Sequence, residues 1–271
     1  MLASGAMSLG QAIVLGIIQG LSEFLPISSS AHLYVVPKLL GWPYHGIAFD
    51  VALHWGTLLA LLIAFWRDWW NLARDVFASD RAVSSKALQT WAMIAVASIP
   101  AAIAGFVLKD IAETQLRSLP LQAATLTVFG FLLWWVDRVA PVRQESGLPG
   151  WRTSLIMGFA QAISLVPGVS RSGVTITAGR SAGLSRVAAA RFSFLLATPI
   201  TFGAGLLELK NLGANGVSTP VLLAGVVSAA IVGVLAIRGL ISWLGRAGFA
   251  AFFIYRVALA LVIVVTLARA A

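Results

Sequence analysis

The sequence has no cysteine and little charge. None of its 271 residues is Cys, and only 11% are Asp, Glu, Lys or Arg. The lack of cysteine excludes disulfides, thiolate metal sites and cysteine nucleophiles. Soluble domains carry roughly a quarter of their residues as charged side chains, so the low charge content argues against a soluble domain.

Two common functional motifs are missing as well. There is no GxxxxGK[ST] motif, so ATP-driven activity is unsupported, and no HExxH motif, so a zinc site is not expected. The formal net charge is +9, but the Lys and Arg residues lie mainly in short connections between apolar runs. That placement suits membrane topology and anionic lipid headgroups, and it argues against nucleic acid as a partner. We expect Arg180, Arg186 and Arg191 to contact lipid headgroups.

The chain is rich in long runs of hydrophobic residues. Hydrophobic residues make up 59% of it, and runs of the ~20 apolar residues needed to cross a bilayer recur along it. These runs predict an all-α, polytopic integral membrane protein in which residues 1–271 form a single transmembrane domain. The predicted spanning helices cover residues 47–66, 87–109, 119–137, 185–207, 218–237 and 248–268.

Two further apolar segments, residues 8–45 and 153–184, are interrupted by proline. The first breaks at Pro26 and the second at Pro167. Proline ends helices, and a helix from residue 153 to the second break would reach only about 21 Å at 1.5 Å per residue. Each segment therefore predicts a broken, re-entrant helical hairpin that enters the bilayer and turns back.

Lys and Arg concentrate in three of the predicted connections. The positive-inside rule places these three in the cytoplasm. Alternation of the spans then requires the first hairpin to begin and end outside, and the second to begin and end inside. Hairpins that enter from opposite faces are typical of transporters with inverted repeats. The basic connections are 67–86, 138–152 and 238–247, and the poorer ones are 110–118, with Arg117, and 208–217, with Lys210.

The two interrupted segments also match each other in sequence. A shift of 142 residues superimposes several small and polar residues, and a shift of 143 superimposes two apolar ones. We predict two inverted-topology repeats, residues 8–137 and 153–268, whose broken segments form halves of one central site. The matched pairs are Gly16 with Gly158, Gln19 with Gln161, Ser22 with Ser164, Ser28 with Ser170, Ser30 with Ser172, Phe49 with Phe192 and Leu53 with Leu196.

The first break carries many polar side chains. Gln19 and Glu23 are four residues apart and share one helix face. A carboxylate inside the bilayer costs several kcal/mol unless it is paired, hydrated or bound to a cation. His32, beside Ser29 and Glu23, is a candidate proton donor to a leaving group or partner of a nucleophile. Any serine of the run 28–30 alternatively serves only as a helix cap.

The second break has the composition of an anion cradle. Its glycines let the backbone approach a ligand, and Arg171 supplies a guanidinium fork suited to phosphate oxygens. A helix beginning after the turn would add amide donors and the positive end of its dipole. A carboxylate facing phosphate suggests a bridging Mg²⁺ or Ca²⁺, with Glu23 as its ligand. The alternative is a cytoplasmic loop with a topology-setting arginine. The hydroxyl residues of this turn are Ser170, Ser172 and Thr175.

These residues are similar to those of a known family. The chain resembles bacterial undecaprenyl-diphosphate phosphatases, also called bacitracin-resistance proteins, over nearly its whole length. The resemblance implies hydrolysis of undecaprenyl diphosphate to undecaprenyl phosphate and inorganic phosphate, which recycles the lipid carrier of cell-wall synthesis and confers bacitracin resistance. It also implies a multi-pass protein of the bacterial inner membrane whose site opens to the periplasm. The motifs are Gln19-x-x-x-Glu23-Phe24-Leu25-Pro26-x-Ser28-Ser29-x-x-His32 and Pro167-Gly168-x-Ser170-Arg171-Ser172-Gly173-x-Thr175, with a third stretch at 192–197.

The resemblance also implies residue roles. Glu23 would be a metal ligand or base, and Ser29 the nucleophile. His32 would transfer the proton, and Arg171 would clamp the diphosphate. Some members have Glu where this chain has Gln19, and an amide is a weaker cation ligand. Phosphate-binding support would come from Ser28, Ser30, Ser170, Ser172 and Thr175.

Two other functions stay open on the residues alone. Inverted repeats with broken helices are also transporter features, so a transporter or lipid flippase is the main rival. A non-catalytic scaffold would leave the intramembrane polar groups unexplained. The sequence does not decide whether Ser29 or water attacks, which cation binds, which polyprenyl length is preferred, or whether the chain forms a homo-oligomer.

Overall fold

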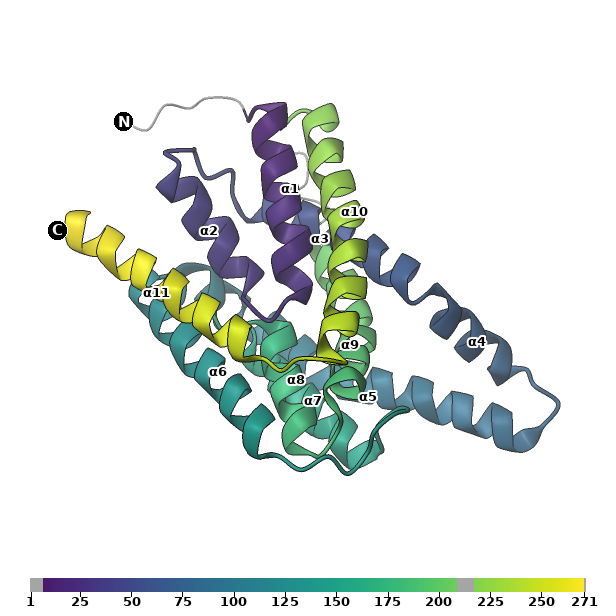
Figure 1. The fold of residues 1–271 in the computed structure, drawn as a ribbon. Coiled ribbons are helices and arrows are strands. Elements are labelled where there is room, and N and C mark those ends of the chain that lie inside the picture. Colours follow the sequence, from purple (N-terminus) through teal and green to yellow (C-terminus); the bar gives the residue numbers. More distant parts are fainter. Residues whose placement is uncertain (1–6, 209–216, 271) are drawn as a thin grey trace.

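Helices make up the architecture of the chain. The structure, a computed structural model, describes residues 7–208 and 217–270. Within these ranges it has no strand, and six helices are long and apolar enough to cross a membrane. The protein is an all-α, polytopic membrane protein, as predicted. Its helices are α1 (Leu9–Phe24), α2 (Ser29–Leu39), α3 (Ile47–Ala64), α4 (Trp66–Val76), α5 (Arg81–Thr114), α6 (Leu119–Val139), α7 (Trp151–Ile163), α8 (Arg171–Ser181), α9 (Arg186–Glu208), α10 (Thr219–Leu244) and α11 (Ala250–Ala270) (Figure 1).

A cap and a proline fix the ends of α1. The Ser8 hydroxyl accepts a hydrogen bond from the Gln11 amide at 3.2 Å, and the Gln11 side chain accepts one from the Ser8 amide at 2.9 Å. This capping box satisfies two backbone groups that the first turn leaves unpaired. The helix ends at Phe24, because Pro26 has no N–H and cannot continue it. With 16 residues, α1 is shorter than the helices that are long enough to span a membrane.

Both predicted hairpins are present. α2 follows α1, and α8 follows α7, with a short turn inside each pair (Figure 1). The residue just before the second helix of each pair has a positive φ, 73° at Ser28 and 72° at Ser170. Residues other than glycine rarely adopt this left-handed region. The same unusual backbone geometry therefore recurs at two positions that the sequence comparison matched.

The packing of the two halves also recurs. α1 packs against α10, and α7 packs against α5. Glycine permits both contacts, because a Cβ on Gly16 would lie 2.3 Å from the Gly225 carbonyl oxygen and one on Gly158 would lie 2.2 Å from that of Ala97. α6 and α11 run side by side (Figure 1). These contacts agree with a duplicated arrangement, while the repeat boundaries stay a prediction.

The region after α3 differs from the expected simple connection. The chain bends at Phe65 and continues as α4, none of whose residues is buried. α4 and the first part of α5 extend away from the other helices (Figure 1). Trp66 and Trp70 are exposed on α4, as befits a helix at the membrane interface. The connection containing Lys210 lies outside the described residues.

The expectation that Arg180 contacts lipid headgroups is wrong. Arg180 is buried, and its Nε donates to Asp137 Oδ1 at 3.1 Å. Arg186 donates to the same oxygen at 2.8 Å, and Arg191 donates to Asp68 at 2.6 Å. The buried Arg180 guanidinium would be costly to leave unpaired. Arg186 and Arg191 are more exposed, and their ion pairs also join one helix to another.

Candidate active site

The two turns meet at one ion pair. Glu23 ends α1, and Arg171 begins α8, 148 residues later. Arg171 Nη2 lies 2.8 Å from Glu23 Oε1, and the side chains are only 12% and 7% exposed. An ion pair so shielded from water is held by its geometry, because removal of either partner leaves a buried charge. The two breaks in the sequence therefore form a single site.

The second oxygen of Glu23 contacts a candidate nucleophile. Ser29 Oγ donates to Glu23 Oε2 at 2.6 Å, and Gln19 Nε2 donates to it at 3.2 Å. A carboxylate in hydrogen-bond contact with a serine hydroxyl is placed to accept its proton. The structure thus brings together Gln19, Glu23, Ser29 and Arg171, as the sequence predicted.

Hydroxyl groups tie the two turns together. Ser30 Oγ accepts a hydrogen bond from the Gly168 amide at 3.5 Å, and Ser172 Oγ donates to the Leu25 carbonyl at 3.4 Å. Each turn also has an internal serine pair, Ser28 with Ser30 at 3.1 Å and Ser170 with Ser172 at 3.3 Å. These serines lie where a phosphate group between the turns would find donors.

Thr175 lies deeper, on the α9 side of α8. Its hydroxyl is 2.6 Å from Ser193 Oγ and donates to the Arg171 carbonyl at 2.7 Å. Thr175 is fully buried. These contacts join α8 to α9, and none of the hydrogen bonds described for Thr175 is with Glu23.

His32 has partners other than those expected. Its Nδ1 lies 2.7 Å from the Ser28 carbonyl oxygen, and its Nε2 lies 2.7 Å from the Tyr255 hydroxyl on α11. The two rings stack with centroids 5.6 Å apart. Both ring nitrogens are therefore engaged, and the described contacts of His32 include neither Glu23 nor the Ser29 side chain.

A different imidazole contacts Glu23, and sequence reasoning missed it. His54 Nε2, on α3, lies 3.4 Å from Glu23 Oε2, and its Nδ1 lies 2.7 Å from the Asp50 carbonyl oxygen. A carbonyl only accepts, so Nδ1 carries a proton and the ring orientation is fixed. The one available signal was an ionisable residue inside an apolar span, which is rare and usually functional.

Sequence reasoning also missed Arg256, on α11. This side chain is fully buried, and every hydrogen bond recorded for its guanidinium goes to a backbone carbonyl. It thereby joins both turns to α6, and it supplies hydrogen bonds to carbonyls of the turns, which lie outside any helix. The acceptors are Pro26 at 3.3 Å, Gly168 at 2.8 Å, Val169 at 3.0 Å, Leu126 at 2.9 Å and Thr125 at 3.3 Å.

Two buried polar atoms at the site have no protein partner. Within the described part of the chain, Arg171 Nη1 and Gln19 Oε1 make no hydrogen bond. Buried polar groups are normally satisfied, so each marks a place for a water, an ion or a ligand. One is a charged donor suited to a phosphate oxygen, and the other is a neutral oxygen suited to a cation. The site therefore has a group for an anion and a group for a cation.

An apolar cavity of about 590 Å³ reaches the turns. Its inner end touches Ser30, Ser164 and Pro167, and its walls come mainly from α3, α5 and α9. A cavity of this composition suits hydrocarbon. The remaining lining residues are Ile47, Val51, Ala101, Ala102, Gly105, Phe106, Arg117, Leu165, Pro199, Ile200, Gly203, Ala204, Leu206, Leu207 and Glu208.

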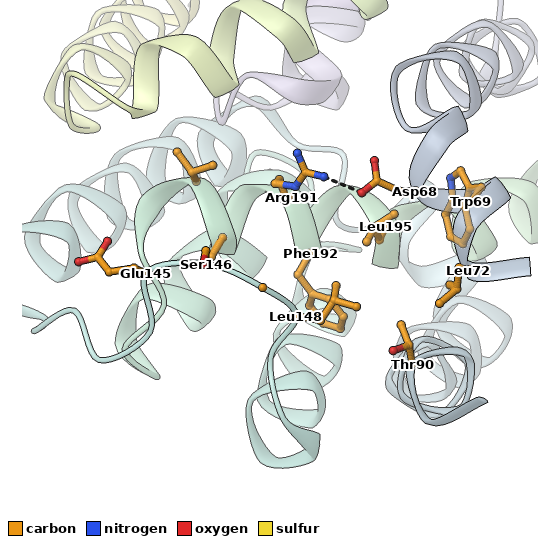
Figure 2. A pocket seen from close by; sticks show the side chains of 13 residues that line it. Asp68, Trp69, Leu72, Thr90, Glu145, Ser146, Leu148, Arg191, Phe192 and Leu195 are labelled. Carbon is orange, nitrogen blue, oxygen red and sulfur yellow. Dashed lines mark hydrogen bonds and ion pairs between the residues drawn. The ribbon is translucent and has the colours of Figure 1, made fainter. Parts of the chain in front are cut away.

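A second cavity, of about 430 Å³, lies elsewhere. It is bounded by α4, α5, α9 and the chain around Glu145, and the Asp68–Arg191 ion pair lies at its edge (Figure 2). It shares no lining residue with the apolar cavity or with the Glu23 cluster. The Glu23 cluster is therefore not at this cavity.

The fold and the site define a membrane-embedded protein in which two re-entrant turns carry a serine, a carboxylate and an arginine. The family model of the bacitracin resistance protein BacA matches residues 12–262. The chain belongs to this family.

Relatives with the printed name undecaprenyl-diphosphatase match nearly the full chain. The protein of Pelotomaculum thermopropionicum is 46% identical over 259 residues, which cover 96% of this chain and 97% of the relative. That of Moorella thermoacetica is 47% identical over 258 residues, covering 95% and 97%. That of Thermomicrobium roseum is 46% identical, covering 97% of this chain and all of the relative.

The role of Arg256 in holding the turns leads to a stability prediction. Arg256→Met keeps much of the side-chain volume but leaves buried carbonyls unpaired, at about 1–3 kcal/mol for each group that finds no water. We expect a melting temperature in detergent lower by several degrees. The matched control is Arg246→Met, at an exposed position, which should melt like the unaltered protein. Equal melting of both variants would contradict the assigned role.

Proposed function

We propose that this protein hydrolyses undecaprenyl diphosphate to undecaprenyl phosphate and inorganic phosphate. The observation that carries the proposal is Ser29 Oγ at 2.6 Å from Glu23, whose other oxygen is held by Arg171. A hydroxyl, a base and a phosphate-binding cation in one buried cluster are the groups that phosphoryl transfer needs. The reaction recycles the lipid carrier of cell-wall synthesis and lowers the amount of diphosphate that bacitracin can sequester.

The substrate is divided between two environments. Its polyprenyl tail lies in the apolar cavity and the surrounding bilayer, and its diphosphate lies between the turns. Arg171 Nη1, which has no partner in the described ranges, binds a phosphate oxygen. The first amides of α8 and the serine hydroxyls add further donors, and the helix dipole favours the anion.

The reaction follows from the contacts of Glu23. Ser29 Oγ attacks the terminal phosphorus and gives its proton to Glu23 Oε2. The bond between the terminal phosphorus and the bridging oxygen breaks, and undecaprenyl phosphate leaves. Water then cleaves the phosphoserine, releasing inorganic phosphate and restoring the hydroxyl. Arg171 stabilises charge on the terminal phosphoryl group in both steps.

The histidines have separate parts in this proposal. His54 contacts Glu23 directly and orients the carboxylate that accepts the Ser29 proton. His32 remains the proposed proton-transfer residue on the leaving-group side, with the Tyr255 hydroxyl as its contact. Direct attack by water, with Glu23 as its base, is the alternative to a serine nucleophile.

A divalent cation, Mg²⁺ or Ca²⁺, fits the oxygen atoms of the cluster. Glu23, Ser29 and the buried Gln19 Oε1 would hold it, and phosphate oxygens would complete the shell. Among the described residues, no three His, Cys, Asp or Glu side chains come together, so the substrate would have to supply several of the ligands. When bound, the cation neutralises charge on the phosphoryl oxygens.

We place the protein in the bacterial inner membrane, with the site open to the periplasm. Arg117 follows the end of α5 and lines the apolar cavity, whereas the basic stretch 67–86 covers α4 and the start of α5. Arg117 and the basic stretch are thus at opposite ends of α5, and the positive-inside rule assigns the basic end to the cytoplasm.

Phosphate release by purified protein tests the proposal. In detergent micelles there is no second compartment, so a transporter or flippase would release no phosphate, whereas a phosphatase would. Ser29→Ala should lower kcat at least ~100-fold, because it removes the nucleophile. Ser118→Ala, which alters a helix cap with no side-chain hydrogen bond, is the control and should keep full activity. Substantial activity in Ser29→Ala would reassign the attack to water.

Removal of divalent cations tests the metal part separately. We expect EDTA to abolish phosphate release, and excess Mg²⁺ or Ca²⁺ to restore it. Glu23→Gln, which removes the carboxylate ligand, should stay inactive after the cation is added back. An undiminished rate in EDTA would rule out the cation while leaving the serine chemistry intact.

A further inference from the structure

The outer end of the apolar cavity carries one arginine. Arg117 lies in the connection between α5 and α6 and lines the cavity. Its Nη1 bonds the Tyr44 hydroxyl, and its Nη2 lies 3.5 Å from Asp50 Oδ2. The Tyr44 hydroxyl donates to the same Asp50 oxygen at 2.7 Å. Arg117 is therefore held beside the cavity, just beyond the end of α5, by two neighbouring side chains.

The same cavity joins Arg117 to the two turns. Ser30 and Pro167, at its inner end, belong to the turns that hold Glu23 and Arg171. The walls between the two ends are apolar. A diphosphate that enters this passage must leave water, and an unpaired anion in apolar surroundings is very costly. A cation at the mouth lowers that cost at the point where the headgroup first loses its hydration.

We propose that Arg117 forms an outer binding site for the diphosphate headgroup, occupied before the headgroup reaches Arg171. This inference rests on the function proposed above. The planar guanidinium matches phosphate oxygens in a two-bond arrangement, as a lysine ammonium does not. Headgroup oxygens replace Asp50 as the partner of Arg117, and the Tyr44 hydroxyl keeps the guanidinium in place.

A carboxylate weakens this site. Asp50 pairs with Arg117 and competes with an incoming diphosphate for the guanidinium. The outer site therefore binds the diphosphate weakly enough to release it inward. A path with successive sites needs such intermediate affinity, because a headgroup bound too tightly at the mouth would not move on.

A second arginine provides a matched control. Arg191 also pairs with an aspartate, Asp68 at 2.6 Å, but at the separate cavity (Figure 2). In both cases the guanidinium carbon lies 5.6 Å from an aromatic ring centroid, Tyr44 for Arg117 and Phe65 for Arg191. The two pairs are alike in chemistry and differ in which cavity they adjoin.

The test measures KM and kcat for phosphate release from a long-chain polyprenyl diphosphate in micelles. Arg117→Gln should raise KM about tenfold and change kcat less than ~2-fold, and Arg117→Lys should fall between. Asp50→Asn should lower KM about threefold, because it removes the competitor for Arg117. Arg191→Gln and Asp68→Asn should leave both constants unchanged.

The opposite changes in KM expected for Arg117→Gln and Asp50→Asn distinguish a role in substrate binding from a role in stabilising the fold. If Arg117 and Asp50 only stabilised the fold, both substitutions would weaken the protein and lower activity together. An unchanged KM in Arg117→Gln, or shifts in the same direction in Arg117→Gln and Asp50→Asn, would overturn the inference. Melting temperatures of all variants show which losses come from unfolding.

Direct binding distinguishes this inference from the proposed reaction. The binding measurement uses the Ser29→Ala variant, because it does not depend on catalysis. Adding Arg117→Gln to this variant should lower the affinity for the lipid diphosphate about tenfold, and the affinity for the lipid monophosphate should fall less. If the unaltered protein binds the diphosphate but releases no phosphate, the reaction is wrong and the binding result still decides the role of Arg117. If the affinity is the same with and without Arg117, the inference about Arg117 is wrong and the proposed reaction is unaffected. If no lipid diphosphate binds, both fail.

Discussion

The ion pair between Glu23 and Arg171 determines the rest of this structure. At 2.8 Å, and almost free of water, it joins the tip of one re-entrant hairpin to the tip of the other. Hydrocarbon tolerates neither charge alone, so the hairpins must meet in the middle of the protein. Their meeting leaves one carboxylate oxygen for Ser29 and one guanidinium nitrogen for a ligand. The arrangement that satisfies the buried charges also creates the chemistry.

Irregular backbone at membrane depth needs donors from outside itself. The turns expose carbonyls that neither hairpin satisfies, and Arg256 of α11 supplies hydrogen bonds to both. The serines Ser30 and Ser172 add the cross-links between the turns. α11 also carries Tyr255, the partner of His32. One helix near the end of the chain thus fixes the geometry of a site whose motifs lie far before it.

The apolar cavity extends this site toward the lipid. Its apolar walls suit a polyprenyl tail. Its polar lining residues are Ser30 and Ser164 beside the turns, and Arg117 and Glu208 beyond or at the ends of α5 and α9. A lipid diphosphate has the same division between a long apolar part and a compact charged part. The cavity thus supports the proposal that the fold acts on the charged headgroup while the lipid tail stays in apolar surroundings.

The sequence alone determined the membrane-spanning character, both hairpins and the grouping of Gln19, Glu23 and Ser29, because apolar length, proline breaks and helical spacing are local signals. That Arg171 joins this group was predicted from the match between the two interrupted segments. The Tyr255 partner of His32 could not be foreseen, because it depends on where α11 packs, 223 residues away in the chain. His54 and Arg256 were missed for the same reason. A single polar residue on an apolar helix has no local pattern, and only the packing of helices distant in sequence decides which group it meets.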